Sequence, residues 1–532
     1  MTNSSRDRIV GTARGSLEET IYAEAGAGTG KTTALVERIV NLLLSDDVKP
    51  ENIVAVTFTV AAASELRQRV RESLEEHALG SANTGANSNR LNEALESLDA
   101  AYIGTIHSFA QSLLAERPLE AGLPPVFEVN DPVVSDDLFD RAWRELLDTE
   151  LGNVEFAQAV GDLQRLGIYS PLQTLKSVAD QFRSDYDLLE SIIPLSAARS
   201  SLDPSSALES IQGELKSAIS FVDYCTDDTD RMFGHLQLDV EQALMVTSTA
   251  LDANDYVESV LAVTQMPQRR TSKGNAQNGR ATISGEDSLK QVRASLKSAS
   301  ELIDATRQMI AHTALVSVIN HVGQMVLDFT DQQREAGSID FQDLLVLSCK
   351  LLDENQGVRR DFQRRYRKIL IDEFQDTDPL QLKLAILLSD STGNGEPDPG
   401  ALFVVGDPKQ SIYRFRRADL SQLSSLIASL NAERLALSRN YRSHSEILEW
   451  VNKVFDPWMS GWQQDPSEPV QASYEPLISG REIEGGTETG HVLIVGHDQH
   501  KYIEEVRQAE SQDIARFALD VGSGEFQIPT GN

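Results

Sequence analysis

The sequence predicts an α/β fold, in which a parallel sheet is flanked by helices and interrupted by a large, mainly helical insertion. Three short apolar segments, 53–59, 369–373 and 402–407, each end in polar residues, as strands do when their carboxyl ends meet at a ligand site. A glycine-rich loop at 25–32 precedes a stretch with helical spacing. Helical periodicity dominates from 118 to 336, which indicates an insertion within one sheet-based domain.

The glycine-rich loop reads A-G-A-G-T-G-K-T. Its amides, at the start of a helix over 33–44, can bind phosphate oxygens, Lys31 can reach the β- and γ-phosphates, and Thr32 can ligate Mg²⁺. The usual pattern has glycine where Ala25 stands, and a glycine-rich turn with a surface lysine is the alternative. The predicted nucleotide-binding residues of the loop are Ala25, Gly26, Ala27, Gly28, Thr29, Gly30, Lys31, Thr32 and Thr33.

A second motif, I-L-I-D-E-F-Q-D-T-D, covers residues 369–378. Its apolar run ends in two adjacent carboxylates, Asp372 and Glu373. A buried strand that delivers Asp and then Glu to its carboxyl end can hold Mg²⁺ and a water-activating base side by side. Most acidic pairs are only solvated surface, but here a phosphate loop occurs in the same chain. Together the two motifs predict an ATPase that uses ATP and Mg²⁺.

Composition favours a soluble protein. The 532 residues, 40% of them hydrophobic, can bury several cores. No run approaches the roughly 18 apolar residues of a membrane span, and the N-terminus lacks an apolar signal segment. Two cysteines, Cys225 and Cys349, cannot make a disulfide framework or a four-cysteine metal site. We therefore expect a cytoplasmic protein without membrane contact.

The formal net charge of −33 argues against a surface that coats nucleic acid. Residues 121–340 alone carry 34 acidic and 17 basic residues. Basic residues gather around the acidic strand, and they form a basic track of Arg359, Arg360, Arg364, Arg365, Arg367, Lys368, Arg414, Arg416 and Arg417. This track can bind a phosphate backbone or can be ordinary solvated helix charge. The loop 267–280, with four bases and no acid, is either a flexible loop or a DNA contact.

Seven blocks stand in the order found in one protein family. They are A-G-A-G-T-G-K-T (25–32), T-F-T-V-A-A-A-S-E-L-R-Q-R (57–69), G-T-I-H-S-F (104–109), D-F-Q-D-L-L (340–345), I-D-E-F-Q-D-T (371–377), V-G-D-P-K-Q-S-I-Y-R-F-R-R-A-D (405–419) and L-S-R-N-Y-R-S (437–443). With these blocks the chain resembles the UvrD/Rep/RecB family of superfamily 1 DNA helicases, and it looks more like the RecB/AddA exonuclease-associated branch than like UvrD itself. The resemblance implies a P-loop RecA-like sheet and ATP hydrolysis coupled to 3′-to-5′ movement on single-stranded DNA in repair or recombination.

The resemblance also implies residue roles. Glu373 would activate the attacking water, Gln410 would sense the γ-phosphate, and Arg442 would serve as an arginine finger. Tyr441 would lie near the adenine, and Thr32 with Asp372 would hold the metal. Aromatic faces stack on any base, and the implied DNA-binding residues are Phe58, Thr59, His107, Tyr413, Phe415 and Arg416. Without the family, Phe58 and Phe415 would be interpreted as core aromatics and His107 as a structural histidine.

The predicted domains follow from the polar breaks and the blocks. They are the N-terminal part of the first RecA-like lobe with the P-loop (1–117), the helical insertion (118–336), the C-terminal part of that lobe (337–440) and the start of an incomplete second lobe (441–532). Residues 491–495 and 504–519 look like the opening strand and helix of the second lobe. The family's T-x-H-x-x-K-G-L-E block, second arginine finger and D-Y-K nuclease block do not occur. The sequence thus predicts the N-terminal part of a longer protein, or a truncated product.

Alternative functions remain open from the sequence. A lone lobe could be a nucleotide-dependent DNA- or partner-binding module without turnover. A P-loop kinase or metabolic ATPase would not need the aromatic blocks at 57–69 and 405–419. Thr33 stands where UvrD-like members often have arginine, which leaves adenine selectivity undecided. The expected partners are single-stranded DNA, duplex junctions and a second helicase/nuclease subunit.

Overall fold

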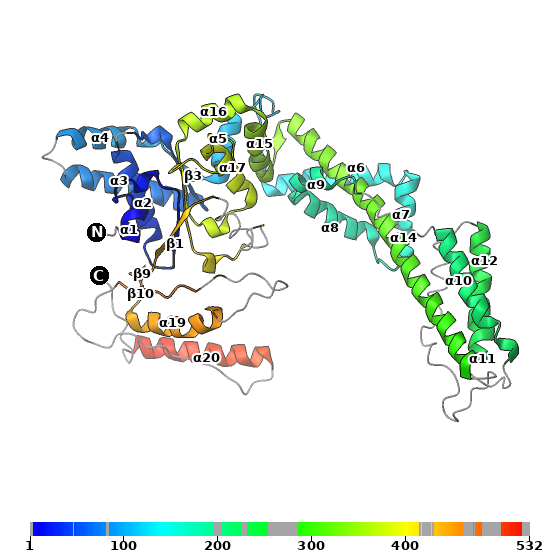
Figure 1. Ribbon diagram of the computed structural model, residues 1–532. Coiled ribbons are helices and arrows are strands. Elements are labelled where there is room, and N and C mark those ends of the chain that lie inside the picture. Colours follow the sequence, from blue (N-terminus) through cyan, green and yellow to red (C-terminus); the bar gives the residue numbers. More distant parts are fainter. Residues whose placement is uncertain are drawn as a thin grey trace. The chain divides into compact units, whose positions relative to one another are not determined.

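The protein is described by a computed structural model that divides into two compact units, Met1–Val126 with Asp343–Asn532, and Phe127–Gln342 (Figure 1). The second unit is the helical insertion, for which the sequence suggested bounds of 118 and 336. The structure describes residues 4–45, 47–80, 85–195, 204–224, 231–253, 286–413, 417, 427, 430–460, 472, 474–480 and 502–523.

The first unit is built on a six-stranded sheet in which every neighbouring pair is parallel. Its strands, in spatial order, are β3 (Tyr102–Thr105), β2 (Ile53–Thr57), β6 (Lys368–Ile371), β7 (Leu402–Gly406), β1 (Ile21–Ala25) and β8 (Glu433–Leu437). The predicted α/β class with a parallel sheet and a helical insertion is confirmed. Because the strands are parallel, all the motifs that follow them emerge at the same side of the sheet, at the carboxyl ends of the strands.

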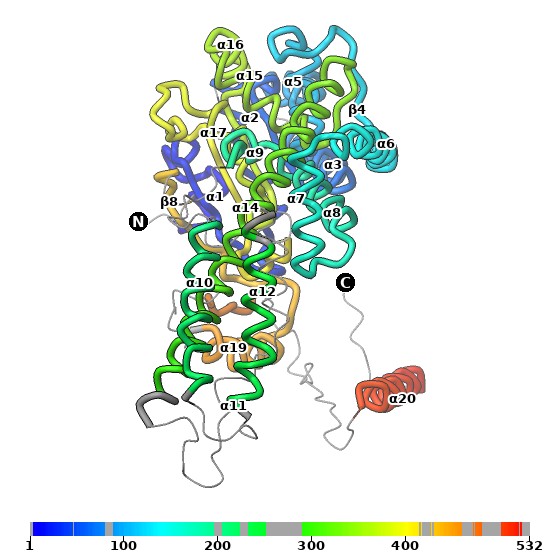
Figure 2. The backbone as a smooth tube through the Cα atoms, turned by 90° about the vertical axis from the view of Figure 1, so that its right-hand side faces the viewer, coloured from blue at the N-terminus to red at the C-terminus, as the bar shows by residue number. Residues whose placement is uncertain are grey.

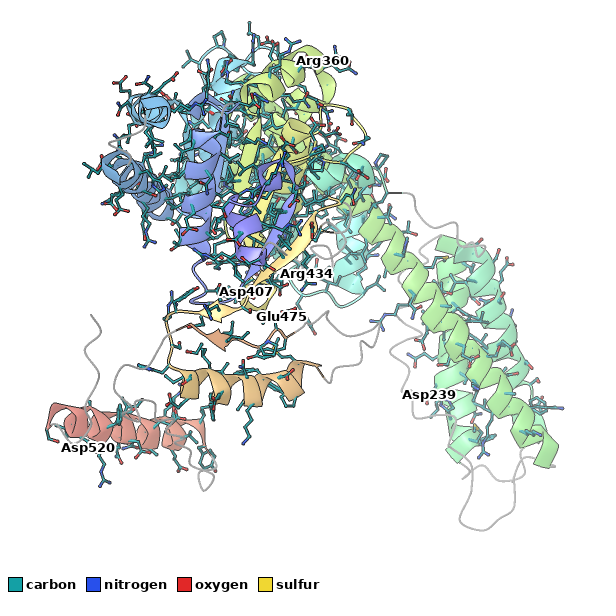
Figure 3. All side chains as sticks on the ribbon, turned by 60° about the vertical axis from the view of Figure 1, so that its left-hand side comes forward. Asp239, Arg360, Asp407, Arg434, Glu475 and Asp520 are labelled. Atoms are coloured by element: carbon teal, nitrogen blue, oxygen red, sulfur yellow. The ribbon has the colours of Figure 1, made fainter. Side chains whose placement is uncertain are left out.

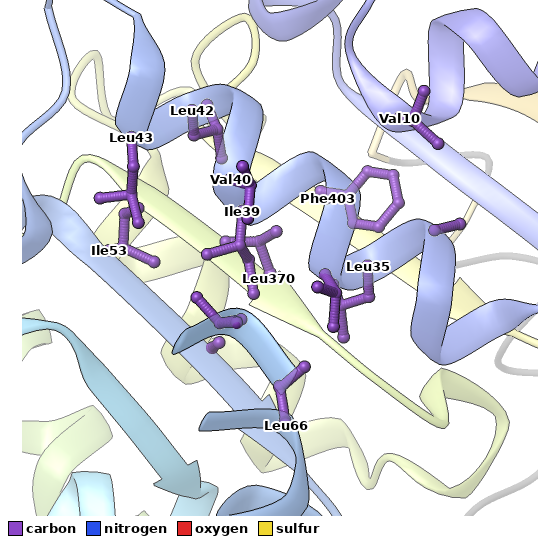
Figure 4. Close-up of a cluster of buried hydrophobic side chains, with 14 of the residues drawn as sticks. Val10, Leu35, Ile39, Val40, Leu42, Leu43, Ile53, Leu66, Leu370 and Phe403 are labelled. Atoms are coloured by element: carbon purple, nitrogen blue, oxygen red, sulfur yellow. The ribbon is translucent and has the colours of Figure 1, made fainter. Parts of the chain in front are cut away.

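Helices cover this sheet. They are α1 (Ser5–Val10), α2 (Lys31–Leu44), α3 (Val60–Gly80), α4 (Gly85–Glu96), α5 (Ile106–Glu116), α15 (Phe341–Glu354), α16 (Gln356–Arg365) and α17 (Pro379–Ser389), with α19 (Ser445–Ser460) and α20 (Ile503–Gly522) later in the chain. Residues of α1 to α4 share one apolar core with the strands. Leu35 and Ile39 of α2 lie against Leu370 and Phe403 of the strands (Figure 4). This packing fixes α2, and with it the loop that precedes it.

One charged side chain is buried inside this core. Arg38 of α2 is only 1% exposed, and its guanidinium lies 4.5 Å from the ring centroid of Phe403. It donates hydrogen bonds to the carbonyl oxygens of Ile9 at 2.9 Å and Ser16 at 3.1 Å. Burial lowers the pKa of Arg38 to about 10, so the group remains charged at neutral pH. Arg38 therefore ties the N-terminal segment to the helix behind the phosphate loop.

The second unit is almost entirely helical. Its elements are β4 (Glu128–Val129), α6 (Pro132–Glu150), α7 (Val154–Arg165), α8 (Pro171–Ser184), α9 (Tyr186–Ile192), α10 (Pro204–Ile219), α11 (Arg231–Gly234), a π-helical turn (His235–Val240), α12 (Glu241–Ala253), α14 (Glu286–Glu335) and β5 (Ser338–Ile339). Apolar residues of α10, α12 and α14 form one core of this unit, and the three helices run side by side (Figure 2). The pairing of β4 with β5 joins the two ends of the unit.

Helix α14 is long and apolar enough to cross a membrane by length and composition alone. Within its segment Lys290–Glu335 an 18-residue window has a mean hydropathy of 1.3, and 39% of that window is buried. The core helix of a soluble protein passes the same test. Polar groups of α14 pack inside the unit, because Asn320 donates to Leu195 O at 3.0 Å and His321 lies 2.9 Å from Glu150. These contacts favour a core helix.

Some sequence predictions fall on residues outside the described ranges. They are the basic loop 267–280, the strand expected at 491–495, and two implied DNA contacts, Phe415 and Arg416.

We predict that Arg38→Met lowers the free energy of unfolding by about 3 kcal/mol, because it leaves several buried carbonyl oxygens without donors. Urea denaturation followed by circular dichroism measures the loss. The control is Arg69→Met, which removes an exposed i,i+4 pair with Glu65 and should cost no more than about 0.5 kcal/mol. Equal losses in the two variants would contradict a structural role for Arg38.

Candidate functional site

The phosphate loop has the backbone that its glycines permit. Gly28 and Gly30 have φ of 76° and 85°, a region that side chains disfavour, and α2 begins directly after them at Lys31. Thr29 is buried and donates its hydroxyl to Gly26 O at 2.8 Å. Ala25, where the usual pattern has glycine, is the last residue of β1 and pairs with Leu437. An extended strand residue does not require glycine, so the departure from the pattern leaves the loop intact.

A segment far along the chain holds this loop. Strand β9 (Arg439–Asn440) follows β8, and the Asn440 amide donates to Ala27 O at 2.6 Å. The Tyr441 backbone amide donates to Gly28 O at 2.8 Å. A Cβ on Gly28 would lie 2.7 Å from the Cβ of Arg442, so glycine is required here for space as well as for φ. The residues predicted as adenine neighbour and arginine finger thus lie against the phosphate loop.

The acidic pair meets the same loop. Strand β6 ends at Ile371, and Lys31 Nζ lies 2.7 Å from Glu373 Oε2, although the two residues are separated by 342 positions. Glu373 has a φ of 50°, which is unusual for a residue with a side chain. Its backbone amide donates to Asp372 Oδ1 at 2.9 Å. The two motifs predicted to share one nucleotide are therefore in direct contact.

Two carboxyl groups in this cluster bind protons more tightly than usual. Burial, assisted by the negative charge of Glu373, raises the pKa of Asp372 to about 6. The same two causes raise the pKa of Asp376 to about 6. Asp376 Oδ1 is buried and accepts no hydrogen bond from any described residue. The cluster thus has more negative charge than Lys31 can neutralise.

That excess charge fits a hard cation. Mg²⁺ prefers oxygen ligands and is usually held in nucleotide sites by one or two carboxylates together with the phosphates. Asp372 and the hydroxyl of Thr32, the second residue of α2, supply such oxygens. Within the described part of the chain, no group of three or more His, Cys, Asp or Glu residues could hold a metal by itself.

The segment after β7 brings Gln410 to the same edge. Its amide donates to Asp407 Oδ2 at 2.8 Å, and Lys409 Nζ lies 3.0 Å from Asp407 Oδ1. Glu24 of β1 is 3% exposed, and its Oε2 accepts a hydrogen bond from Arg434 Nε at 2.7 Å. Figure 3 labels Asp407 and Arg434, the second of which is bound to Glu24. This ionic cluster joins β1, β8 and the segment 407–410.

The implied DNA-binding residues lie along this edge as far as the structure describes them. Phe58, directly after β2, is 39% exposed, and its ring centroid lies 4.9 Å from that of Tyr413. The core position that the residues alone suggested for Phe58 is therefore wrong. Thr59 caps α3 through a bond from Ala62 N at 3.1 Å, and His107 lies in the first turn of α5. The aromatic blocks after β2 and β7 thus form one aromatic pair, of exposed Phe58 and partly buried Tyr413.

A groove opens beside these residues. Its volume is about 600 Å³, and it lies between the first turns of α3 and the end of β3. Its lining residues are Val60, Ala63, Ser64, Arg67, Gln68, Arg71, Tyr102, Ile103, Gly104, Thr105 and Ser108.

A family model described as the UvrD/REP helicase N-terminal domain matches residues 9–431. The chain belongs to this family. The resemblance found in the sequence blocks is confirmed, and the match runs across both halves of the sheet and the insertion between them.

Similar proteins are named as the A subunit of an ATP-dependent helicase/nuclease. One from Pediococcus pentosaceus is 27% identical over 82% of this chain and 38% of its own length. Others from Syntrophomonas wolfei (27% identical; 83% of this chain, 37% of its own) and Listeria monocytogenes serotype 4a (28% identical; 82% and 38%) align similarly. The chain therefore spans less than two fifths of the length of these relatives, which are consistent with the RecB/AddA branch.

Most of the described basic track is engaged within this helicase-family domain. Arg365 pairs with Glu116 at 2.6 Å. The remaining contacts are Arg359 to Leu387 O at 3.1 Å, Arg367 to Asp47 O at 2.8 Å, and Lys368 to Leu17 O at 3.1 Å and Gly400 O at 2.8 Å. The sequence left open a phosphate-binding track or ordinary solvated helix charge, and the structure instead engages these four residues in contacts within the fold. Arg360, labelled in Figure 3, lies on the same helix α16. Arg414 and Arg416 lie outside the described ranges.

Sequence reasoning did not single out several residues at this site. Asn440, Gln375 and Glu24 are all buried polar groups that hold site segments together. Each stands inside or next to a block already noted, as the N of N-Y-R-S, the Q of D-E-F-Q-D and the residue before A-G-A-G-T-G-K-T. The sequence shows that these residues stand beside motifs, but it does not show which groups they bind.

We predict that Asp372→Asn stabilises the nucleotide-free protein at pH 8 by about 1–2 kcal/mol. The folded state raises this pKa from 3.8 to about 6, so ionisation of Asp372 costs folding free energy, at most about 1.4 kcal/mol per pKa unit. The gain should be absent below a pH of about 4, appear as the pH rises towards 6 and stay constant above it. Urea unfolding across this pH range measures it.

The control for this prediction is Asp353→Asn, which removes an exposed pair with Lys383 and should change stability by less than about 0.5 kcal/mol at any pH. A destabilised Asp372→Asn protein at pH 8 would show that burial and the charge of Glu373 do not disfavour the ionised carboxylate.

Proposed function

We propose that this chain is the ATP-binding lobe of an ATP-dependent DNA helicase or translocase. In the whole protein, ATP hydrolysis would drive 3′-to-5′ movement on single-stranded DNA and strand separation at duplex junctions, in repair or recombination. The protein would be cytoplasmic and would act beside a second helicase/nuclease subunit. The relatives' name, which makes each of them one lettered subunit of a helicase/nuclease, supports such a partner.

One observation carries the ATPase part of the proposal. Lys31 Nζ of the phosphate loop and Glu373 Oε2 of the acidic strand are 2.7 Å apart. A phosphate group bound by the loop amides would contact Lys31 and lie beside the carboxylates of Asp372 and Glu373. A phosphate cradle, a metal carboxylate and a base at this distance suit phosphoryl transfer to water.

The binding roles follow from the positions. The amides at the start of α2 and Lys31 bind the phosphates, while Thr32 and Asp372 hold Mg²⁺. Mg²⁺, when bound, neutralises charge on the phosphate oxygens during transfer. Phosphate oxygens compete with Glu373 for Lys31, which frees the Glu373 carboxylate to accept a proton from the attacking water. In this proposal the phosphates replace Glu373 as the partner of Lys31.

Further residues act around the γ-phosphate and the base. Arg442, next to Gly28, offsets negative charge that develops in the transition state, a role worth roughly 10³–10⁵-fold in rate where the arginine is well placed. Gln410 contacts the γ-phosphate and reports its presence to the DNA-binding segment that follows it. Tyr441 stacks beside the adenine, and Thr33 takes the position next to it.

Single-stranded DNA is proposed to cross the carboxyl edge of the sheet. Phe58 and Tyr413 offer aromatic faces, and Thr59 and His107 lie at the ends of the neighbouring strands. Stacking on such faces is indifferent to sequence, as a translocase requires. Phe415 and Arg416 would extend the same contact. The groove lined by Arg67 and Arg71 offers positive charge beside it.

We predict that Lys31→Ala and Glu373→Gln separate binding from hydrolysis. The protein is the chain with whatever follows Asn532 in its reading frame. Lys31→Ala should weaken ATP binding at least tenfold, because the phosphate loses its cation. Glu373→Gln should keep ATP affinity within about threefold and lose at least 10²-fold in DNA-stimulated hydrolysis, because the amide cannot accept a proton. Fluorescent-nucleotide titration and a phosphate-release assay with poly(dT) measure both.

The same assay distinguishes the alternatives. Hydrolysis stimulated by poly(dT) in the unmodified protein supports a translocase, and hydrolysis indifferent to DNA indicates a metabolic ATPase. Tight ATP and DNA binding without hydrolysis indicates a nucleotide-dependent binding module. Full activity of Glu373→Gln would remove Glu373 from the role of base.

We predict that Phe58→Ala weakens poly(dT) binding by about 1–3 kcal/mol, the value of one stacked base, with no change in ATP affinity. Fluorescence anisotropy of labelled poly(dT) measures it. The control is Leu79→Ala, an exposed apolar residue near the end of α3 that does not line the groove. Equal affinities for the Phe58→Ala protein and the control would place the DNA elsewhere.

A further inference from the structure

One buried side chain connects the acidic strand to the segment that carries Gln410. Gln375 lies in the 3₁₀ turn Phe374–Asp376, two residues after Glu373, and is 3% exposed. Its amide nitrogen donates to Glu373 Oε2 at 2.8 Å and lies 3.4 Å from Asp376 Oδ2. Its amide oxygen accepts from the backbone N–H of Asp407 at 2.8 Å. Both ends of this amide are used, each by a different motif.

The chemistry of the partners fixes the orientation of this amide. A carboxylate only accepts and a backbone N–H only donates. Rotating the amide by 180° would set its oxygen against Glu373 and Asp376 and its NH₂ group against the Asp407 N–H. Gln375 can therefore occupy this site in one orientation only, and that orientation joins Glu373 to Asp407.

The backbone around Gln375 is shaped for the same contact. Gly406 ends β7, and a Cβ there would lie 2.6 Å from Gln375 Oε1. Ser411 Oγ donates to the Gln375 carbonyl oxygen at 3.3 Å. Gln375 thus contacts both ends of the segment 407–411, and only glycine at 406 allows its side chain to approach so closely.

The connection continues to Gln410. The backbone N–H of Asp407 donates to the Gln375 amide oxygen, and the Asp407 carboxylate accepts from the Gln410 amide at 2.8 Å. On the other side, Glu373 Oε2 is shared between Lys31 Nζ at 2.7 Å and the Gln375 amide. Once a phosphate takes Lys31, Gln375 is the described donor that remains on this oxygen.

We propose that Gln375 is a positioning residue that couples the base Glu373 to the γ-phosphate contact Gln410. It holds the Glu373 carboxylate in place after Lys31 turns to the phosphate, and it transmits displacement of the segment 407–411 to that carboxylate. This inference rests on the proposed function, because it assumes that nucleotide binds between Lys31, Glu373 and Gln410. If Gln375 only packed against the turn, its amide would not need to donate to one motif and accept from another.

The test compares Gln375→Met with Gln363→Met in the 532-residue chain. Gln363 is a matched control, because its amide also donates two hydrogen bonds, to Leu387 O at 2.8 Å and Asp390 O at 2.7 Å, and both acceptors lie at the end of α17. Hydrogen exchange followed by mass spectrometry reports on peptides spanning 405–413, with and without Mg²⁺ and AMP-PNP. A fluorescent-nucleotide titration with AMP-PNP as competitor reports affinity.

Without nucleotide, Gln375→Met should exchange the Asp407 amide about tenfold faster, as loss of one hydrogen bond implies. With Mg²⁺ and AMP-PNP, the unmodified chain and Gln363→Met should change their exchange over 405–413. Gln375→Met should bind AMP-PNP within about threefold of the unmodified chain and show no such change.

Each outcome decides something. A nucleotide-dependent change retained in Gln375→Met overturns the inference, and so does AMP-PNP binding to the unmodified chain without any change over 405–413. Failure of the unmodified chain to bind AMP-PNP overturns the proposed function and the inference with it. In the protein with its downstream sequence, Gln375→Met should lower kcat roughly 10- to 100-fold with an unchanged KM for ATP. If Gln375 had a purely structural role, both Met variants would lose thermal stability, and the two variants would have the same kcat.

Discussion

Asp372, Glu373 and Asp376 place three carboxyl groups within five residues at the end of β6, and Lys31 is the cation that meets them. Burial, and after it the negative charge of Glu373, raises the pKa values of Asp372 and Asp376. The fold must therefore bring Lys31 across the end of β7, which lies between β1 and β6 in the sheet. The rest of the site depends on that approach. A nucleotide would replace one arrangement of charge by another, with phosphate taking Lys31 and a metal taking the carboxylates.

The position of Lys31 depends in turn on contacts from three other parts of the unit. Arg38 anchors α2 to the N-terminal segment, and Asn440 holds the loop carbonyl of Ala27. Glu24 sits below the loop between Arg434 of β8 and Lys409, whose Nζ lies 3.6 Å from its carboxylate. Arg38, Glu24 and Asn440 are buried polar groups, so each stays in place only while its partners do. The loop is held by residues that arrive from both halves of the interrupted lobe, which explains how an insertion of this size is tolerated.

Much of the fold and of the site could be predicted because it follows from local pattern. The apolar strands, the helix after the glycine-rich loop and the carboxylates at the end of β6 are each encoded within a few residues. The contacts that make a site of them join residues hundreds of positions apart, and no periodicity specifies which polar group Gln375 or Asn440 meets. Exposure was also misjudged, since Phe58 reads as a core aromatic by composition but lies at the sheet edge beside Tyr413. The burial of the Phe58 side chain depends on which segments pack next to it and not on its residue type.

The use of the basic residues changes how DNA binding should be understood. Phosphate contacts from lysine and arginine give binding that falls steeply with salt, through release of counterions. Arg359, Arg365, Arg367 and Lys368 are engaged with carbonyl oxygens or with Glu116, and the chain carries a net charge of −33. These four cations are therefore committed to contacts within the fold, while Phe58 and Tyr413 form an aromatic pair at the carboxyl ends of the strands. If DNA crosses this edge, stacking must supply a large share of the affinity, and that share resists salt. Under the proposed function, contacts to the faces of bases would let the lobe release and regrip DNA without first breaking the ion pairs and hydrogen bonds of these four cations.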